Sequence, residues 1–303
     1  NRGRLLTARL ISLLTLLVAM AGLLLVAPSP VAAEPEAAGP VSITYDFQWI
    51  RQGNVGVVRV TGADIADVRA VFQERVHPFF SDKRGFTGLI AADMEQNVGQ
   101  YPLQVWVRYL DGTSERIDKT IEVNYGEFGR ADVYLPASLM PLLERSVEDE
   151  EMARLSNIFS RFTPERYWAD EGFALASTAT QIGPFGTWRL YNETTWRRHT
   201  GTDYRMPSGT PVTTVASGRV MLASTLPIRG GYVLVDHGWG IYSGYAHLSE
   251  LLVVPGQWVR KGDVIALSGL NGRSAGAHLH WEMTVSGAWV NPEQLVGLGL
   301  GAD

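Results

Sequence analysis

The sequence has 303 residues and a formal net charge of −5, from 26 Lys and Arg against 31 Asp and Glu. With 46% hydrophobic residues it is long enough for two globular domains of roughly 100–200 residues each, and this composition excludes a disordered or collagen-like chain. The mild acidity argues against a nucleic-acid partner. The absence of Cys excludes disulfide scaffolds, Cys-ligated zinc or iron–sulfur sites and cysteine catalysis, so any metal site must use His, Asp and Glu.

Residues 1–33 have the layout of a secretory signal peptide. Three Arg and no acidic residue precede an uncharged apolar stretch over residues 10–27, and the small residues Val31, Ala32 and Ala33 suit a cleavage site. The alternative is an uncleaved membrane anchor, because the apolar stretch is at the lower limit for a bilayer span. Membrane contact is expected only in that case. A short stretch followed at once by a cleavage site favours removal, which predicts a secreted protein.

Charge divides the remaining chain into two parts. Residues 34–182 hold 14 basic and 23 acidic residues, a net charge of −9, whereas residues 183–303 hold 9 basic and 8 acidic residues, a net charge of +1. Five of the six His lie in the second part. The acidic part and the His-rich part are therefore predicted to be different modules.

Residues 41–135 are predicted to form an accessory antiparallel β-sandwich of the Ig-like class, because apolar residues recur there with period two. Leu103, Val105 and Val107 alternate with other residues, and the turn signal Asp111-Gly112 leads to a return strand, which predicts a hairpin. No Cys pair supports a true immunoglobulin domain. His77 has no potential ligand neighbour at useful spacing, so it is assigned no role.

Residues 136–182 are predicted to be a helical connector, and residues 183–296 a compact, mostly antiparallel β domain whose strand-like runs are broken by Gly and Pro. The clearest helix of the connector covers residues 146–162, with Ser146 as its capping residue. Its apolar stripe consists of Met152, Leu155, Phe159 and Phe162.

Four His and one Asp fall in three fragments of the Gly-rich part, RRHTGTDY, GYAHLS and GAHLHWEM. His278 and His280 are two apart and share one face of a strand, and a short turn around Gly201 can bring His199 and Asp203 to one centre. Two His nitrogens and one carboxylate oxygen are a common catalytic zinc set, and five groups for three ligand places leave two His for proton transfer and oxyanion stabilisation. Each fragment alone also occurs by chance. Together they indicate a metal hydrolase, without saying which His has which role.

The stretch from Gly183 to Leu295 resembles the M23 (lysostaphin/LytM-like) zinc metallopeptidases. The matching text includes HTGTDY, GYVLVDHGWGIYSGYAHLS and GAHLHWEM, which cover every functional motif of the family. The family often has Pro where Ala277 stands and Phe where Trp281 stands. Neither departure touches a proposed ligand or base, so they affect the expected shape of the groove and leave the expected catalysis intact.

The resemblance implies a division of roles among these residues. His199, Asp203 and His280 are expected to bind Zn²⁺, and His247 and His278 to be the catalytic pair. One of the pair takes a proton from the attacking water and the other helps to hold the tetrahedral oxyanion.

Four further residues are expected to contact substrate: Tyr191, Asn192, His237 and Trp239. Glu282 lies on the same strand face as His278 and His280 and is expected at most to orient a ligand His, because the helical HExxH context of a general base is missing.

The resemblance implies a secreted, cell-wall-associated zinc endopeptidase that hydrolyses peptide bonds in peptidoglycan stem or cross-bridge peptides. Two alternatives stay open. One is a non-catalytic M23-like regulator of a cell-wall amidase, a class that usually loses the ligands, whereas all five positions are intact in this sequence. The other is a surface-binding protein in which the sandwich carries the binding function.

Overall fold

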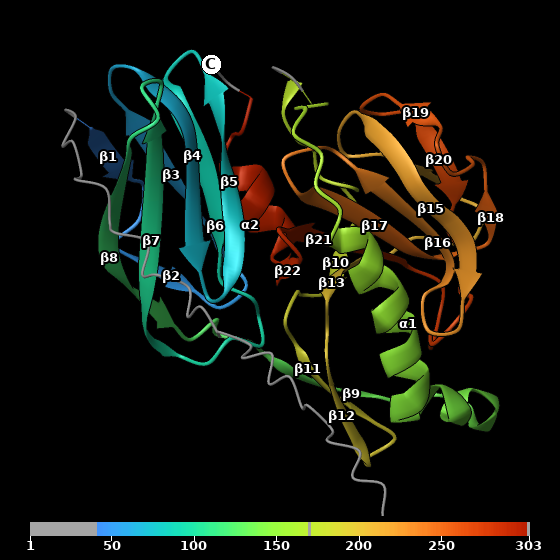
Figure 1. Cartoon of the computed structure of the whole chain (residues 1–303). Coiled ribbons are helices and arrows are strands. Elements are labelled where there is room, and N and C mark those ends of the chain that lie inside the picture. The colour runs from blue at the N-terminus through green and yellow to red at the C-terminus, as the bar shows by residue number, and fades with distance from the viewer. Residues whose placement is uncertain (1–40, 169–170, 302–303) are drawn as a thin grey trace, which may run out of the picture. The chain divides into compact units, whose positions relative to one another are not determined.

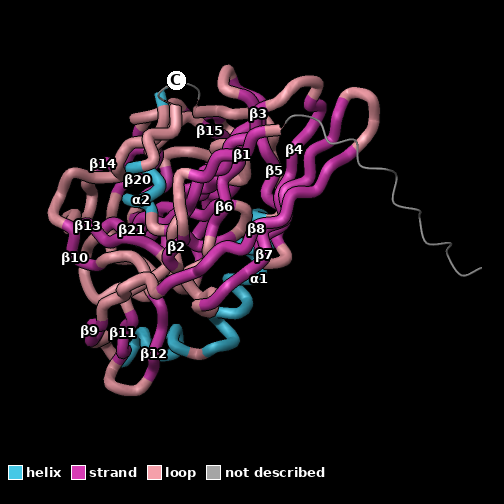
Figure 2. The backbone as a smooth tube through the Cα atoms, turned by 90° about the vertical axis from the view of Figure 1, so that its left-hand side faces the viewer, coloured by secondary structure: helices cyan, strands magenta, loops and turns pink. Residues whose placement is uncertain are grey.

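The computed structural model describes residues 41–168 and 171–301, and the predicted signal peptide lies outside them. The described residues fall within one structural unit and are mainly strands, as Figures 1 and 2 show. The mainly β fold class predicted from the sequence is therefore confirmed. Among the helices of the described residues, none has both the length and the apolar character that a bilayer span requires.

The first eight strands form a sheet that folds over on itself at β5. Residues 75–78 of this strand pair with β4 and residues 79–82 pair with β6, so the sheet encloses a core between two layers. The predicted hairpin is β7–β8, with Leu103, Val105 and Val107 fully buried. The eight strands are β1 (Ser42–Tyr45), β2 (Trp49–Arg51), β3 (Val55–Thr61), β4 (Ile65–Phe72), β5 (Arg75–Asp82), β6 (Gly85–Ala91), β7 (Gly99–Tyr109) and β8 (Ser114–Asn124).

The strand order of this sheet is β1-β3-β6-β5-β4-β7-β8-β2. Its two halves, β1-β3-β6-β5 and β4-β7-β8, follow the ABED and CFG order of immunoglobulin-type sandwiches. One pair departs from the predicted antiparallel pattern, since β2 runs parallel to β8.

The segment after the first sheet connects it to the His-rich part. Strand β9 (Arg130–Val133), inside the range predicted for the sandwich, pairs instead with β11 (Trp188–Tyr191), which also pairs with β12 (Thr195–Arg198). The 3₁₀ helix η1 (Ala137–Leu143) and helix α1 (Arg145–Phe159) follow.

Helix α1 differs from its prediction at both ends. Its N-cap is Glu144 rather than Ser146, and no side chain caps it. It ends at Phe159, and Phe162 lies beyond it, 45% exposed and stacked on Phe80 of β5 with ring centroids 5.7 Å apart. Phe162 therefore extends the apolar spacing of the helix without belonging to it.

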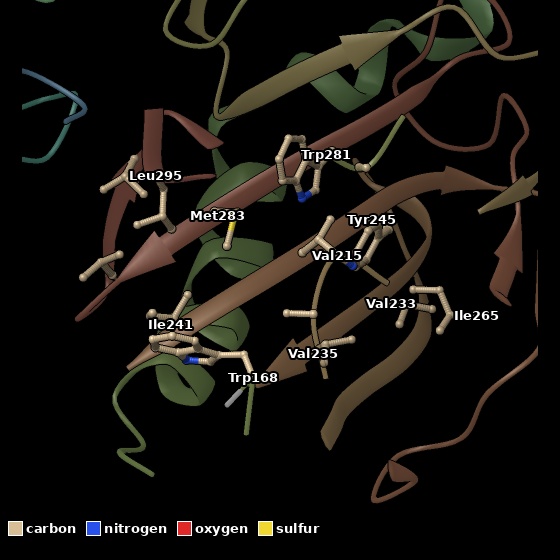
Figure 3. Close-up of a cluster of buried hydrophobic side chains, with 14 of the residues drawn as sticks. Trp168, Val215, Val233, Val235, Ile241, Tyr245, Ile265, Trp281, Met283 and Leu295 are labelled. Atoms are coloured by element: carbon tan, nitrogen blue, oxygen red, sulfur yellow. The ribbon is translucent and has the colours of Figure 1, made fainter. Parts of the chain in front are cut away.

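The His-rich part is built on an antiparallel sheet with the order β10-β13-β21-β17-β16-β15-β19, and β22 pairs with the far part of β21. One face of this sheet is covered by an apolar core that contains Tyr245 of β17, Met283 of β21 and Leu295 of α2 (Figure 3). The elements are β10 (Gln181–Gly183), β13 (Gly201–Tyr204), β15 (Gly218–Leu226), β16 (Gly230–Asp236), β17 (Ile241–Leu248), β19 (Trp258–Val259), β21 (Leu279–Val285), β22 (Ala288–Val290) and α2 (Pro292–Gly297). A small second sheet contains β14 (Pro211–Thr213), β20 (Val264–Leu267) and β18 (Glu250–Leu251).

Candidate metal centre

Strand register brings the predicted ligands together. Strands β13 and β21 are antiparallel neighbours in which Asp203 lies directly opposite His280. Cross-strand partners are near enough for their side chains to meet. His199 precedes β13, and the chain passes from it to Asp203 through Gly201, where a Cβ atom would overlap the carbonyl oxygen of Trp281. The close approach of the two strands thus requires Gly at this position.

Three donor atoms converge at this point. The Nε2 of His199 lies 2.9 Å from the Nδ1 of His280, and each of these atoms lies 3.0 Å from the Oδ1 of Asp203. All three residues are buried, with at most 6% of their surface exposed. Within the described residues this is the group whose donor atoms could hold a metal ion, and its chemistry fits zinc. The zinc cofactor predicted from the sequence therefore has a matching donor set.

The other ring nitrogen of each ligand His is already engaged. The Nδ1–H of His199 donates to the carbonyl of Pro184 at 2.8 Å, and the Nε2–H of His280 donates to a carboxylate oxygen of Glu282 at 3.0 Å. Such partners fix the tautomer and orientation of a ligand imidazole. The lone pair of each ring therefore faces the convergence point.

The two remaining His lie beside the three donors. The ring centroids of His247 and His278 are 4.6 Å apart, and the Nδ1–H groups donate at 2.8 Å to the carbonyls of Asn271 and Gly276. The Nε2 of His278 is buried, lacks a hydrogen-bond partner and lies 3.5 Å from the Oδ1 of Asp203. His247 has a left-handed backbone with φ of 61°, a strained conformation that occurs at functional sites.

The electrostatics favour the metal-binding protonation states of Asp203 and His199. Burial would raise the pKa of Asp203, but His199 and Arg189 hold it well below its usual range. Burial lowers the pKa of His199 to about 4 and that of His247 well below its ordinary value. For His280 burial acts in the same direction, yet the neighbouring carboxylates raise its pKa. These carboxylates make a negative environment, which also suits a cation.

Two Arg residues that the sequence did not reveal, the half-buried Arg189 and the buried Arg229, support the donors. Arg189 donates to the Oδ2 of Asp203, which leaves the Oδ1 facing the two imidazoles. Arg229 donates twice to Glu282, at 2.7 and 3.0 Å, and holds the pKa of that carboxyl well below its usual range although burial opposes this. Glu282 was expected to orient a ligand His, and its contact with His280 fits that role. No local pattern marks Arg189 or Arg229, because their partners are distant in sequence.

Two cavities adjoin the donors. The smaller, of about 60 Å³, is lined by His199, His247 and His280 together with residues of α1. The larger, of about 560 Å³, lies beside Asp203 and His278 and is walled on one side by β9. The larger cavity provides room for a ligand next to the His cluster.

Of the four residues expected to contact substrate, Tyr191 alone lines these two cavities. Asn192 instead uses its side chain to bind the backbone N–H and carbonyl of Leu135. His237 has no exposed surface and is bonded to Ser217 and Ser243.

Trp239 is 5% exposed and stacks on Phe80 with ring centroids 4.1 Å apart. The structure thus places His237 and Trp239 outside the lining of both cavities, with their rings packed against other protein groups.

The centre contains two imidazoles and one carboxylate that converge in an antiparallel β domain, and two further imidazoles lie alongside. This arrangement is typical of the metallopeptidase class. Residues 197–292 match the model of peptidase family M23. The match falls in the His-rich part of the chain and confirms the resemblance found in the sequence.

Relatives of this domain include peptidoglycan hydrolases and an activator. A segment of 68 residues, 22% of this chain, is 44% identical to the peptidoglycan DD-endopeptidase ShyA of Vibrio cholerae. A segment of 64 residues, 21% of this chain, is 45% identical to the murein hydrolase activator EnvC of Escherichia coli. These alignments span only 16% and 15% of the two relatives.

A crystal structure of a candidate M23 peptidase from Pseudomonas aeruginosa is similar over a longer range. The aligned region covers 81% of this chain and 94% of the chain in that crystal structure, with 25% sequence identity and a TM-score of 0.62. The likeness therefore extends beyond the family-matched segment.

Proposed function

We propose that this protein is a secreted zinc endopeptidase that hydrolyses peptide bonds in peptidoglycan stem or cross-bridge peptides. The observation that carries the proposal is the triangle of donor atoms from His199, Asp203 and His280, with sides of 2.9 to 3.0 Å. Zinc held there supplies a Lewis acid that polarises a scissile carbonyl and makes water acidic near neutral pH. The similarity to ShyA supports peptidoglycan as the substrate.

His247 and His278 carry the proton transfers in this proposal. Because each Nδ1–H donates to a carbonyl, the neutral ring presents the lone pair of its Nε2. A lone pair beside the donor triangle can take the proton of an attacking water, and the resulting N–H can then donate to the tetrahedral oxyanion or to the leaving amine. With both rings in place, one can act as base through the lone pair of its Nε2, and the other can stabilise the oxyanion when its Nε2 carries a proton.

Room for a peptide is present on the same side. The cavity of about 560 Å³ runs between β9 and the segment that precedes His278, and Tyr191 lines it. An extended peptide seated there would bring a carbonyl to Asp203 and His278. Cleavage of short, exposed wall peptides agrees with a site that opens into a cavity of this size.

Zinc content and hydrolysis of defined wall fragments test the proposal. The purified protein should contain near-stoichiometric zinc, and it should release fragments from purified muropeptides that mass spectrometry identifies by the bond cut. His280→Ala should lose both properties because a ligand is removed, whereas Glu250→Gln, an exposed change, should retain both. A protein that takes up no zinc even when zinc is supplied would end the hydrolase proposal.

The similarity to EnvC keeps an activating role as the second candidate. That role predicts no muropeptide cleavage by the protein alone and a rise in the activity of a wall amidase when the protein is added, unchanged by His280→Ala. Secretion is tested separately: the mass of the protein recovered from the culture medium should correspond to a chain that begins at Glu34.

A further inference from the structure

A chain of buried charged groups leads from helix α1 to the ligand His280. His280 donates to Glu282, and Glu282 accepts two hydrogen bonds from Arg229. The remaining guanidinium nitrogen of Arg229, Nη1, donates to the Oε1 of Glu151 at 2.8 Å. The side chains of Arg229, Glu282 and Glu151 are 7%, 1% and 0% exposed. Three charged side chains with almost no contact with water thus stand in line behind one ligand.

Hydrophobic packing sets the position of Glu151. Glu151, Leu155 and Phe159 are the buried residues of α1 and recur every four positions, so they lie on one face of the helix. Leu155 and Phe159 pack in the cluster that contains Leu226 and Trp289 of the M23 domain. A carboxylate therefore occupies one end of an otherwise apolar buried stripe, where α1 meets the sheet (Figure 1).

Both oxygens of Glu151 are used. The Oε1 binds Arg229, and the Oε2 accepts the backbone N–H of Ile228 at 2.7 Å. Two adjacent residues of the turn between β15 and β16 are thus held by one side chain of the helix. A charge buried in this way is stable only while it is paired and hydrogen-bonded, so loss of Glu151 would leave the guanidinium only partly paired.

Arg229 transmits this constraint to the ligand. It holds both oxygens of Glu282, and the Oε2 of that carboxylate is the acceptor for the Nε2–H of His280. Tyr232 and Thr200 also donate to Glu282, each at 2.7 Å, but of these donors Arg229 alone bonds to both oxygens. A shift of the guanidinium therefore changes the hydrogen bonds on both oxygens of the group that orients the ligand ring. Partners that orient ligand imidazoles affect metal affinity by 10–100-fold when they are changed.

We propose that Glu151 is a positioning residue of the metal centre, which acts on His280 through Arg229 and Glu282. Glu151 belongs to α1, outside the family-matched residues 197–292. The site would then be completed by the segment that precedes the domain. The inference rests on the proposed function only in taking the donor triangle as a zinc site.

Zinc affinity of the full chain tests this inference without any assay of hydrolysis. Glu151→Gln removes the charge at nearly constant shape, and Glu150→Gln makes the same change at the adjacent exposed position of α1. Competition with a chromophoric chelator measures the zinc dissociation constant. The visible spectrum of the cobalt-substituted protein reports the coordination geometry, and thermal unfolding of the metal-free protein measures stability.

Glu151→Gln should raise the zinc dissociation constant roughly 10-fold, at the low end of the range for direct partners of a ligand, and shift the cobalt spectrum. Glu150→Gln should match the parent in both. A merely structural role for Glu151 would lower the unfolding temperature and leave the dissociation constant and the spectrum unchanged, and that result overturns the proposal.

A double variant covers the case in which Glu151→Gln does not fold. Glu151→Met combined with Arg229→Met replaces two of the three buried charges with apolar side chains of similar length and removes the link to Glu282, which keeps its hydrogen bonds from Tyr232 and Thr200. It should fold and still bind zinc about 10-fold more weakly than the parent; parental affinity would refute the proposal.

If the parent itself binds no zinc, the metal centre and this inference both fail. If the parent binds zinc and cleaves no muropeptide, only the proposed function fails.

Discussion

His77 should make the protein lose stability as the pH falls from about 7.5 to about 5. The ring is fully buried among the strands of the first sheet, its Nδ1–H donates to the carbonyl of Leu89 at 2.9 Å, and its buried Nε2 has no hydrogen-bond partner. Burial lowers its pKa to about 4, against 6.5 for an unperturbed ring. The folded state therefore binds fewer protons than the unfolded state in this range, so the stabilisation is complete above pH 6.5 and is lost as the pH falls through 4. With these two pKa values, linkage gives a loss of about 2 kcal/mol between pH 7.5 and 5.

Urea unfolding at several pH values measures this loss in the parent and in His77→Asn. Asn keeps a donor near the position of the Nδ1–H but does not titrate, so the variant should lose about 2 kcal/mol less than the parent over the same pH range. A chelator in every sample keeps the contribution of the metal centre equal in both proteins. Gln100→Asn, an exposed change in β7, should reproduce the parental pH dependence. Equal pH dependence in His77→Asn and the parent would refute the view that the buried ring stays neutral.

Three further changes probe the packing and the site. Gly201→Ala places a Cβ against the carbonyl oxygen of Trp281, so it should cost about 1–3 kcal/mol in thermal unfolding and weaken zinc binding in chelator competition. Leu155→Ala empties a fully buried position of α1, so urea unfolding should show a loss of about 2–5 kcal/mol. Glu282→Gln weakens the acceptor for the Nε2–H of His280, so the zinc dissociation constant should rise about 10–100-fold.

Much of the fold could be predicted from the alternation of apolar and other residues in the strands, because all side chains on one face of a sheet share the same environment, core or solvent. Leu103, Val105 and Val107 follow this rule and are fully buried. The end of helix α1 did not follow from spacing: Phe162 continues the helical period, but its partner is Phe80 on another element. Periodicity predicts which residues are buried and does not predict which residues they pack against.

The same distinction applies to the candidate site. His278 and His280 were predictable as a pair because their strand places Leu279 on the opposite face, and Leu279 indeed lies in the apolar core. Arg229 and Glu151 were not predictable, since their contact joins residues 78 positions apart. The register between strands and the packing of a helix on the sheet bring residues so distant in sequence together, and a local motif predicts neither.

The orientation of the four site imidazoles depends mainly on backbone groups. Three of them donate to the carbonyls of Pro184, Asn271 and Gly276, which lie in loops, and the fourth donates to a carboxylate. Since every residue type carries a backbone carbonyl, the identity of a loop residue matters less than the path of the loop. The motif therefore specifies which groups are present, whereas the path of the surrounding loops decides which nitrogen of each ring faces the metal or the substrate. Substitutions that keep the loop path should be tolerated. A change of loop length at Pro184 should impair metal binding, and changes at Asn271 or Gly276 should impair hydrolysis, even with every motif residue intact.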